Sequence, residues 1–411
     1  MLQCATYMDE KLIKRLILAS ALLLCLAISA AALYALVTDY HRQLGDFGTS
    51  YYAGKAYAQG LNPYDNKILS QIAGDTVWAP FVYSPPTLWF FRIFSGLDYQ
   101  TATYLLLSLK GVLLFALMYL WGKAILQKKA DLLFPLFCLF AFHAAILGDI
   151  RSGNISIVEE FLIWLAFYFY LKNSRLLFCL FILLAAFFKL TPIIFMALLF
   201  FGEREKRYTY LLGSCIIFGA ILLASYTASP LLFRGYLHNM ALSAMHGEHG
   251  AINPATLPLI ADVFGFLQER TNLTVPQAIP WAVFFAIAAA IVFVSWQSCI
   301  ALRASKDQNK DRVLVFFACV VYALILPRFK DYSYILLLVP TYFIVTRVSY
   351  TKGFALILLS ESVITVLSGV NLPVSLLNTN VFPLGYYPLV LAYCVWALYL
   401  YTMWKSPRII A

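Results

Sequence analysis

Charge is scarce in this chain. Of its 411 residues only 12% are Asp, Glu, Lys or Arg, whereas 62% are hydrophobic and 17% are aromatic. A soluble domain carries about 25% charged residues, so this composition excludes an ordinary soluble protein and indicates that lipid solvates most of the surface. The net charge of +10 is then explained by Lys and Arg in short cytoplasmic loops rather than by a nucleic-acid partner.

The common motifs of soluble enzymes are missing as well. The sequence has no CxxC, no HExxH, no P-loop and no GxGxxG after a predicted strand, so it gives no sign of a soluble-enzyme cofactor site and we expect no cofactor. None of the eight cysteines falls in a loop expected on the outer side of the membrane, since they lie in expected spans or near the N-terminus, and disulfide bonds are therefore not expected. We also find no internal duplication of the kind that many transporters carry.

Long hydrophobic runs dominate what is present. A membrane-crossing helix needs about 20 apolar residues, and the sequence predicts an all-α polytopic membrane protein that forms one integral membrane domain over residues 1–411. About ten spans are expected, near residues 14–37, 100–121, 131–148, 152–171, 208–228, 280–302, 313–327, 334–350, 353–370 and 386–404. With this arrangement most of the 30 Lys and Arg residues lie in cytoplasmic loops. We therefore expect a multi-pass protein of the plasma (inner) membrane with both termini in the cytoplasm.

The apolar stretch 176–201 is expected to behave differently. Lys189 and Pro192 lie at its centre, and a proline next to a buried cation is where a helix breaks. If the stretch crossed the membrane, the basic residues of 204–207 would face outside. We therefore predict a broken or re-entrant helix that enters and leaves on the cytoplasmic side.

Two segments expected outside the membrane, 38–99 and 229–279, are longer than a simple connection requires. We expect them to contain short helices and to form an extracytoplasmic subdomain over an active-site cavity. A third outer turn, Pro327–Tyr334, is short but rich in charge. Charge beside a membrane is a functional-site hypothesis by default, and the candidates in these segments are Asp46, Tyr51, Tyr52, Lys55, Tyr64, Tyr83, His246, His249, Arg328, Lys330 and Asp331.

Four motifs in order along the chain resemble glycosyltransferase family 87, the polyprenyl-phosphate-mannose-dependent α-mannosyltransferases of the glycosyltransferase-C superfamily. They are Asp46-Phe47 with the Tyr51-Tyr52…Gly60…Pro63-Tyr64 tail, Tyr83-Ser84-Pro85-Pro86, Gly153-Asn154 and Lys189-Leu190-Thr191-Pro192. A looser fifth match is the Pro327–Tyr334 turn, where Arg-Phe-Lys-Asp-Tyr replaces the pattern of many relatives. The resemblance implies a glycosyltransferase-C-like helical bundle.

The resemblance also implies an activity. Such an enzyme is expected to move a hexose, mannose, from a polyprenyl-phosphate donor to a glycolipid or polysaccharide acceptor on the outer face, with inversion. Asp46 matches the aspartate expected to deprotonate the acceptor, and Arg328, Lys330 and Lys189 are candidates for the donor phosphate. The remaining candidates, among them Asn154, would contact substrate. No metal is required, although Asp46 and Asp331 could hold one weakly.

Other interpretations stay open at this point. Asp46 could cap a helix, Lys189 could be a structural cation paired with Glu159 or Glu160, and the tyrosines could pack rather than bind sugar. A transporter or flippase of lipid-linked sugars would use the same ligand, but it should carry charge through the full depth of the membrane. A non-catalytic scaffold of the cell envelope would not need the basic outer turn.

Overall fold

The computed structural model describes residues 45–127, 133–201, 207–245, 248–271, 274–304, 309–347 and 384–405. Every regular element among them is helical, which confirms the predicted all-α class. The predicted spans 14–37 and 353–370 and the candidate His246 lie outside the described residues.

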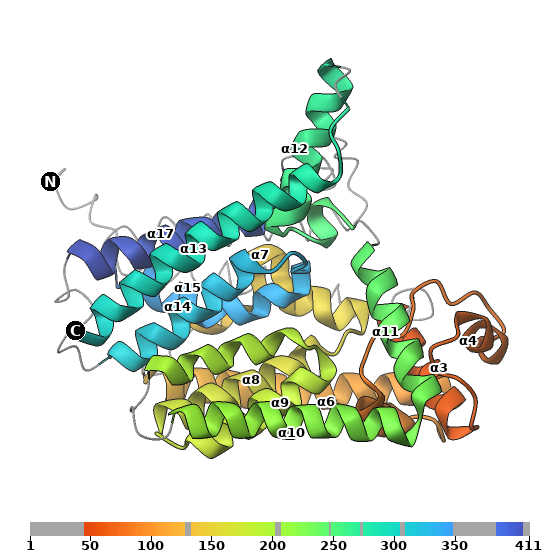
Figure 1. The fold of residues 1–411 in the computed structure, drawn as a ribbon. Helices are drawn as coiled ribbons and strands as arrows, with labels where there is room; N and C mark the ends of the chain where they lie inside the picture. The colour runs from red at the N-terminus through yellow and green to blue at the C-terminus, as the bar shows by residue number, and fades with distance from the viewer. Residues whose placement is uncertain are drawn as a thin grey trace, which may run out of the picture.

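The described residues include four helices that are long and apolar enough to cross a membrane. They are Tyr99–Leu126 (α6, Tyr99–Tyr119, with the π-helical turn η2, Leu120–Leu126), Tyr208–Ala228 of α10 (Arg207–Ala228), α13 (Ala278–Ala304) and Tyr387–Trp404 of α17 (Tyr387–Lys405). They correspond to the predicted spans 100–121, 208–228, 280–302 and 386–404. Figure 1 shows α13 and α17 along one side of the bundle and α10 along the opposite side. The number of spans, expected to be about ten, stays a prediction.

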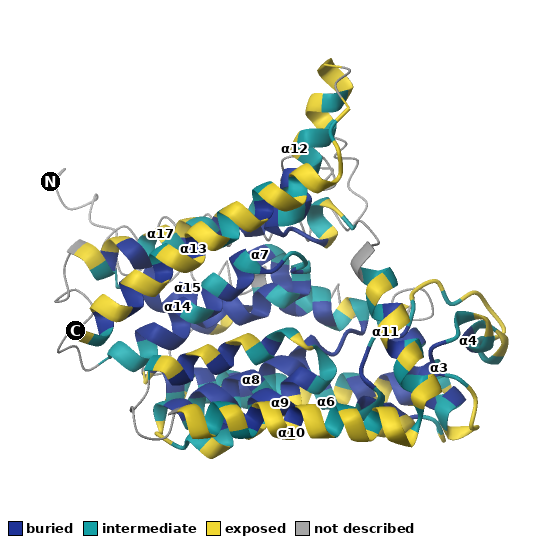
Figure 2. Ribbon diagram, in the orientation of Figure 1, coloured by how far each residue is buried: buried dark blue, intermediate teal, exposed yellow. Residues whose placement is uncertain are grey.

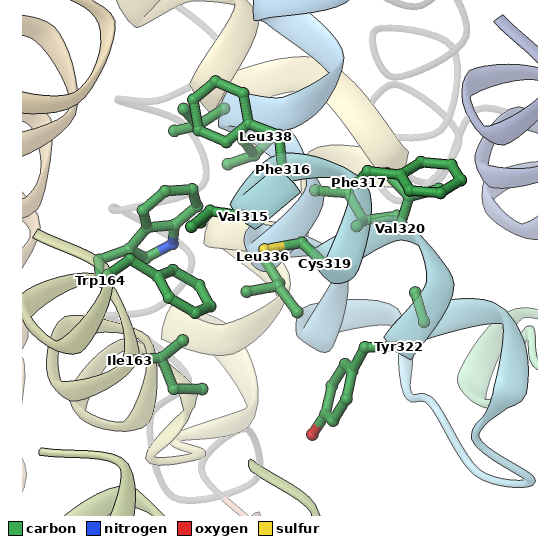
Figure 3. Packing of buried hydrophobic residues seen from close by; sticks show 14 of the residues in the cluster. Ile163, Trp164, Val315, Phe316, Phe317, Cys319, Val320, Tyr322, Leu336 and Leu338 are labelled. Carbon is green, nitrogen blue, oxygen red and sulfur yellow. The ribbon is translucent and has the colours of Figure 1, made fainter. Parts of the chain in front are cut away.

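The remaining predicted spans within the described residues form shorter or interrupted helices at the centre of the bundle. α14 (Lys310–Ile325) has 16 residues, and η5 (Asp331–Leu337) continues into α15 (Leu338–Val345). These elements are mostly buried in Figure 2, whereas α10 and α13 expose much of their surface. Figure 3 shows part of this core, where Trp164 of α8 (Ser156–Leu171) lies beside Phe316 of α14. Elements surrounded by protein need not match the thickness of the lipid.

One span predicted as continuous is broken. Within α7 (Leu133–Ser152) the backbone leaves the helical conformation at Ala141–Ala144, and three of these residues have φ between 52° and 57°. No glycine or proline occupies this stretch, so the sequence offers no local signal for the break. The second half of α7 meets α8 (Ser156–Leu171) at an angle of 119°.

The break predicted at the centre of 176–201 is confirmed. α9 (Arg175–Phe188) ends at Lys189, whose backbone is extended, and the 3₁₀ helix η3 (Thr191–Phe201) follows. The chain then doubles back, because the Tyr170 hydroxyl, just before the start of α9, donates to the Leu198 carbonyl near the end of η3 at 3.2 Å. The two arms of the broken helix therefore begin and end at the same end of the bundle.

At the opposite end, residues 45–98 fold into short helices, as expected for the first long outer segment. They are α3 (Gly45–Ala58), α4 (Asn66–Ala73), η1 (Pro85–Thr87) and α5 (Leu88–Arg92). The Asp65 side chain caps α4 by accepting from the Lys67 N–H at 2.9 Å. α3 and α5 cross closely at Gly54, where a Cβ atom would lie 2.5 Å from the Phe91 carbonyl oxygen.

The second long segment is more regular than the sequence suggested. It forms α11 (Pro230–Met245), η4 (Gly250–Ile252) and α12 (Thr256–Thr271). Elsewhere in the chain, the short 3₁₀ helix η6 (Leu384–Tyr386) comes directly before α17. Figure 1 shows α11 beside α3 and α4, and α12 projecting away from the bundle. The Asn239 amide of α11 donates to the backbone carbonyls of Tyr64 and Phe81 at 3.0 and 3.1 Å. α11 thus fastens the two outer segments to each other.

Candidate active site

Asp46 lies in the first turn of α3 and is partly exposed. Its Oδ2 accepts a hydrogen bond of 2.7 Å from the Asn154 amide nitrogen, which also lies 3.0 Å from the Tyr332 hydroxyl. The carboxylate therefore bonds across the fold to a residue 108 positions away, instead of capping the first turn of its own helix. A helix N-terminus also favours a negative charge at this position.

Asn154 owes its position to the bend between α7 and α8. Gly153 adopts a left-handed backbone with φ of 70°, which glycine permits without strain and which ends α7. The next helix starts at Ser156, whose backbone N–H donates to Asp149 Oδ1 at 3.0 Å. The Gly153-Asn154 motif thus holds a buried amide at the sharp corner, pointing at Asp46.

Two further groups found by sequence, Tyr83 and Asp331, lie close to Asp46. Burial first, and the Asp46 carboxylate next, raise the pKa of the Tyr83 hydroxyl well above its usual range. Burial likewise raises the pKa of Asp331 to about 6, with Asp46 adding to the shift, while the Tyr332 N–H, Lys330 and His143 oppose it. Asp331 packs against α7, because a Cβ atom on Gly148 would lie 3.6 Å from its Oδ2.

The Lys189 side chain extends from the break between α9 and η3 towards Ser156 and Tyr332. Its ammonium lies 2.6 Å from Glu159 Oε2 and donates to Ser156 Oγ at 3.0 Å. The pairing with Glu159 is one of the two that the sequence suggested. The side chain is 28% exposed, and its nitrogen lies 5.4 Å from the centre of the Tyr332 ring.

Arg328 and Lys330 gather around a third carboxylate, that of Glu248. An Arg328 guanidinium nitrogen lies 2.6 Å from Glu248 Oε2, and the Lys330 ammonium lies 3.1 Å from the same oxygen. Arg328 also donates to the carbonyl and the hydroxyl of Ser243 at the end of α11. Burial alone would raise the pKa of Glu248, but Lys330 and Arg328 outweigh it and hold the pKa below its usual range.

A buried ion pair between α6 and α7 stabilises the bend between α7 and α8. The Lys110 ammonium of α6 lies 2.9 Å from Asp149 Oδ2, with side-chain exposures of 1% and 0%, and it also donates to the Asp149 carbonyl at 2.8 Å. Removing one partner of such a pair leaves an uncompensated buried charge and costs about 3–5 kcal/mol. Sequence reasoning assigned no role to this pair, although charged residues inside apolar segments are a signal that could have found it.

The tyrosines of the first segment divide into two groups. Tyr51 and Tyr64 are 1% and 5% exposed, and their hydroxyls donate to the carbonyls of Leu97 and Tyr83 at 2.6 and 2.8 Å. Both therefore hold the segment together. Tyr52 is only partly buried and stacks on the Tyr99 ring at 6.0 Å. The Lys55 ammonium lies 5.6 Å from the Tyr51 ring.

His249 belongs to a different group of contacts. Its Nδ1 lies 2.6 Å from Asp262 Oδ1 on α12, and the other oxygen of Asp262 accepts from the Tyr386 hydroxyl at 2.5 Å. These bonds tie the loop after α11 to α12 and to the start of α17. In the part of the chain that the structure describes, no three His, Cys, Asp or Glu side chains are grouped to hold a metal ion.

The arrangement combines a partly exposed carboxylate, cationic groups and aromatic walls at one end of an apolar bundle. The family model of glycosyltransferase family 87 matches residues 81–327, which is well over half of the chain. The chain belongs to glycosyltransferase family 87. It is therefore a membrane-embedded glycosyltransferase that acts with a sugar donor, an acceptor and the lipid bilayer. No curated protein and no solved structure gives a significant match.

The matched region contains only part of the candidate site of this glycosyltransferase. Tyr83, Asn154 and Lys189 lie inside it, whereas Asp46 lies before it and the residues Arg328–Asp331 lie after it. The structure brings both outlying segments onto the matched core through Asn154, which lies within hydrogen-bonding distance of Asp46 and Tyr332. Tyr332 was missed as a site residue, although it lies in the outer turn that the sequence singled out.

Proposed function

We propose that this glycosyltransferase moves a hexose, mannose, from a polyprenyl-phosphate donor to a hydroxyl of a glycolipid or polysaccharide on the extracytoplasmic face of the plasma membrane. Family membership supports the reaction class, and the apolar bundle suits a donor that is delivered from the bilayer. The polar side chains at one end suit chemistry at a membrane surface. In this proposal the outer segments 38–99 and 229–279 cover the active site.

The observation that carries the proposal is the environment of Asp46. Its carboxylate is held by the neutral amide of Asn154 at 2.7 Å, and no cation pairs with it among the described residues. An oriented carboxylate that is not neutralised can accept a proton, which is the property that a general base requires.

The proposed step is a direct displacement. Asp46 takes the proton of the acceptor hydroxyl, the acceptor oxygen bonds to the anomeric carbon, and the bond from that carbon to the phosphate oxygen breaks. The electron pair leaves with the polyprenyl phosphate, and the anomeric configuration inverts. One base is sufficient, whereas a glycosidase needs two carboxyl groups.

Negative charge develops on the phosphate as it leaves, so cations there stabilise the transition state more than the bound donor. Arg328 and Lys330 are the proposed ligands, because the turn that carries them also carries Tyr332, whose hydroxyl bonds the same Asn154 amide as Asp46. Glu248 pairs with both cations, and a donor phosphate would take over part of that pairing. Tyr52, Lys55, Tyr83 and Asp331 are proposed to contact sugar or acceptor.

The test compares labelled mannosyl polyprenyl phosphate, glucosyl polyprenyl phosphate and nucleotide-linked mannose as donors to purified full-length protein. Glycolipid and polysaccharide fractions of cell envelopes serve as acceptors. We expect label to move from the mannosyl lipid only, and the new glycosidic bond to be inverted relative to the donor. Transfer from the nucleotide-linked sugar, or retention of configuration, would overturn the proposal.

A further inference from the structure

Two side chains, those of Ser156 and Asn154, link Lys189 to Asp46 through three successive hydrogen bonds. The Lys189 ammonium donates to Ser156 Oγ at 3.0 Å, the Ser156 hydroxyl bonds Asn154 Oδ1 at 2.9 Å, and the Asn154 amide nitrogen donates to Asp46 Oδ2 at 2.7 Å. We call Lys189, Ser156 and Asn154 the relay. It joins the break after α9, the start of α8 and the bend between α7 and α8.

The two ends of the relay fix the directions of its bonds. An ammonium group can only donate, so Ser156 Oγ accepts from Lys189, and a carboxylate can only accept, so the amide nitrogen of Asn154 faces Asp46 and its Oδ1 accepts from the Ser156 hydroxyl. The amide oxygen of Asn154 is thereby occupied, and the amide nitrogen is the group that faces Asp46. With the amide turned over, two oxygens would face each other and the carboxylate would lose its donor.

The two inner members of the relay, Ser156 and Asn154, are buried and anchored. Ser156 and Asn154 are 1% and 4% exposed, so water cannot readily replace a missing partner, and an unsatisfied buried group is costly. The Ser156 backbone is fixed independently, because its N–H donates to Asp149. The ammonium of Lys189 bonds Glu159 as well as Ser156, so two of its three hydrogens are directed at the start of α8.

We propose that Lys189 is a positioning residue that acts through Ser156 and Asn154 to orient the carboxylate of Asp46, and is not a ligand of the donor phosphate. This inference rests on the proposed function, in which Asp46 is the base. It separates the cations of the site into two groups: Arg328 and Lys330 serve the donor, and Lys189 serves the base.

The first test is Ser156→Ala in the full-length protein, assayed with whichever polyprenyl-phosphate sugar the wild type turns over. Alanine can neither accept from Lys189 nor donate to Asn154, so we expect kcat to fall about tenfold while the KM for the donor stays unchanged. Ser298→Ala is the matched control, because Ser298 is also 1% exposed and its hydroxyl is bonded within α13 and by Trp404. The control should keep the wild-type kcat.

The second test adds Lys189→Met and the double variant. If both residues act through one relay, the double variant loses no more kcat than the worse single variant, whereas independent effects would multiply. A rise in donor KM with kcat preserved in Lys189→Met would make Lys189 a phosphate ligand and overturn the proposal. Wild-type kcat in Ser156→Ala would overturn it as well.

Lys189→Met leaves Glu159 buried without its cation, and this variant could fail to fold. Lys189→Met/Glu159→Leu then replaces it in the cycle, since removing both charges is far less destabilising than removing one. The two proposals fail differently. If mannosyl lipid is not a donor for the wild type, the proposed function fails, whereas an active wild type with an unaffected Ser156→Ala variant means that the relay fails.

Discussion

Asp46 and Glu248 both lie beside the turn that carries Arg328–Tyr332, yet their partners are of opposite kinds. Asp46 accepts from a neutral amide, whereas Glu248 pairs with two cations at 2.6 and 3.1 Å. Two cations beside one carboxylate leave a positive charge and lower the pKa of Glu248. A carboxylate can therefore serve as a proton acceptor at Asp46, where its partner is neutral, and position two cations at Glu248.

We expect the largest loss of activity when the Asp46 carboxylate is removed. Asp46→Asn keeps the shape of the side chain but removes its basicity, so we expect kcat to fall by about a thousandfold. Steady-state transfer measures this loss. Glu248→Gln is the matched control, because it makes the same chemical change at the other carboxylate, and we expect its kcat to stay within about tenfold of wild type. Equal losses in both variants would contradict the distinction.

The next effect concerns the cations that Glu248 holds. Arg328→Gln removes a charge proposed to stabilise the leaving phosphate, and we expect a loss of about a hundredfold in kcat/KM for the donor. Arg303→Gln is the control, since Arg303 also pairs with a carboxylate, that of Asp311, at 2.8 Å on α14. If the two variants lose the same activity, Arg328 has only a structural role.

A third prediction tests the placement of Asp46 by α3. Gly54→Ala places a Cβ atom 2.5 Å from the Phe91 carbonyl oxygen, so α3 must shift away from α5, at a cost of about 1–3 kcal/mol. We expect a lower thermal unfolding temperature and a several-fold lower kcat. Gly111→Ala in α6 meets no atom within 4 Å and should be neutral in both measurements.

The smallest effect is a pH dependence at Asp331. Its pKa is raised from 3.8 to about 6 in the folded protein, so the stability linked to this group is fully present below pH 3.8 and is lost as the pH rises through 6. Asp331→Asn should remove that decline and raise the unfolding temperature by a few degrees above pH 6.

Glu248→Gln should change the pH dependence in the opposite direction. The folded pKa of Glu248 lies below 4.5, so its contribution is present above pH 4.5 and is lost as the pH falls further. Thermal unfolding scans of both variants between pH 3.5 and 8, referenced to wild type, compare the two signs. The same sign in both variants would contradict the assignment.

Helices and their ends could be predicted from the sequence where a local pattern, such as a proline or an apolar run, determines the backbone. Pro192 beside Lys189 predicted the break that ends α9, and the apolar runs predicted α6, α10, α13 and α17. The break at Ala141–Ala144 had no glycine or proline to announce it. It arises within tertiary packing, where Phe142 stacks on Tyr334 with ring centres 5.4 Å apart.

The site was predictable as a set of residues but not as a set of contacts. Asp46, Asn154 and Lys189 could be nominated one by one, because each stands out from an apolar background. The pairing of Asp46 with Asn154 spans 108 positions, and no local pattern encodes it. The burial of Tyr51 and Tyr64 could not be foreseen either, since a tyrosine beside a polar loop suits packing and sugar binding equally well.

A single-turnover experiment tests the central claim most directly. Wild type, Asp46→Asn and Glu248→Gln are each loaded with labelled mannosyl polyprenyl phosphate, the bound donor is measured, and acceptor is then added. We expect all three proteins to bind donor, wild type and Glu248→Gln to transfer the label, and Asp46→Asn to hold it without transfer. Transfer by donor-loaded Asp46→Asn at a rate within about tenfold of wild type would contradict the role of Asp46 as the base.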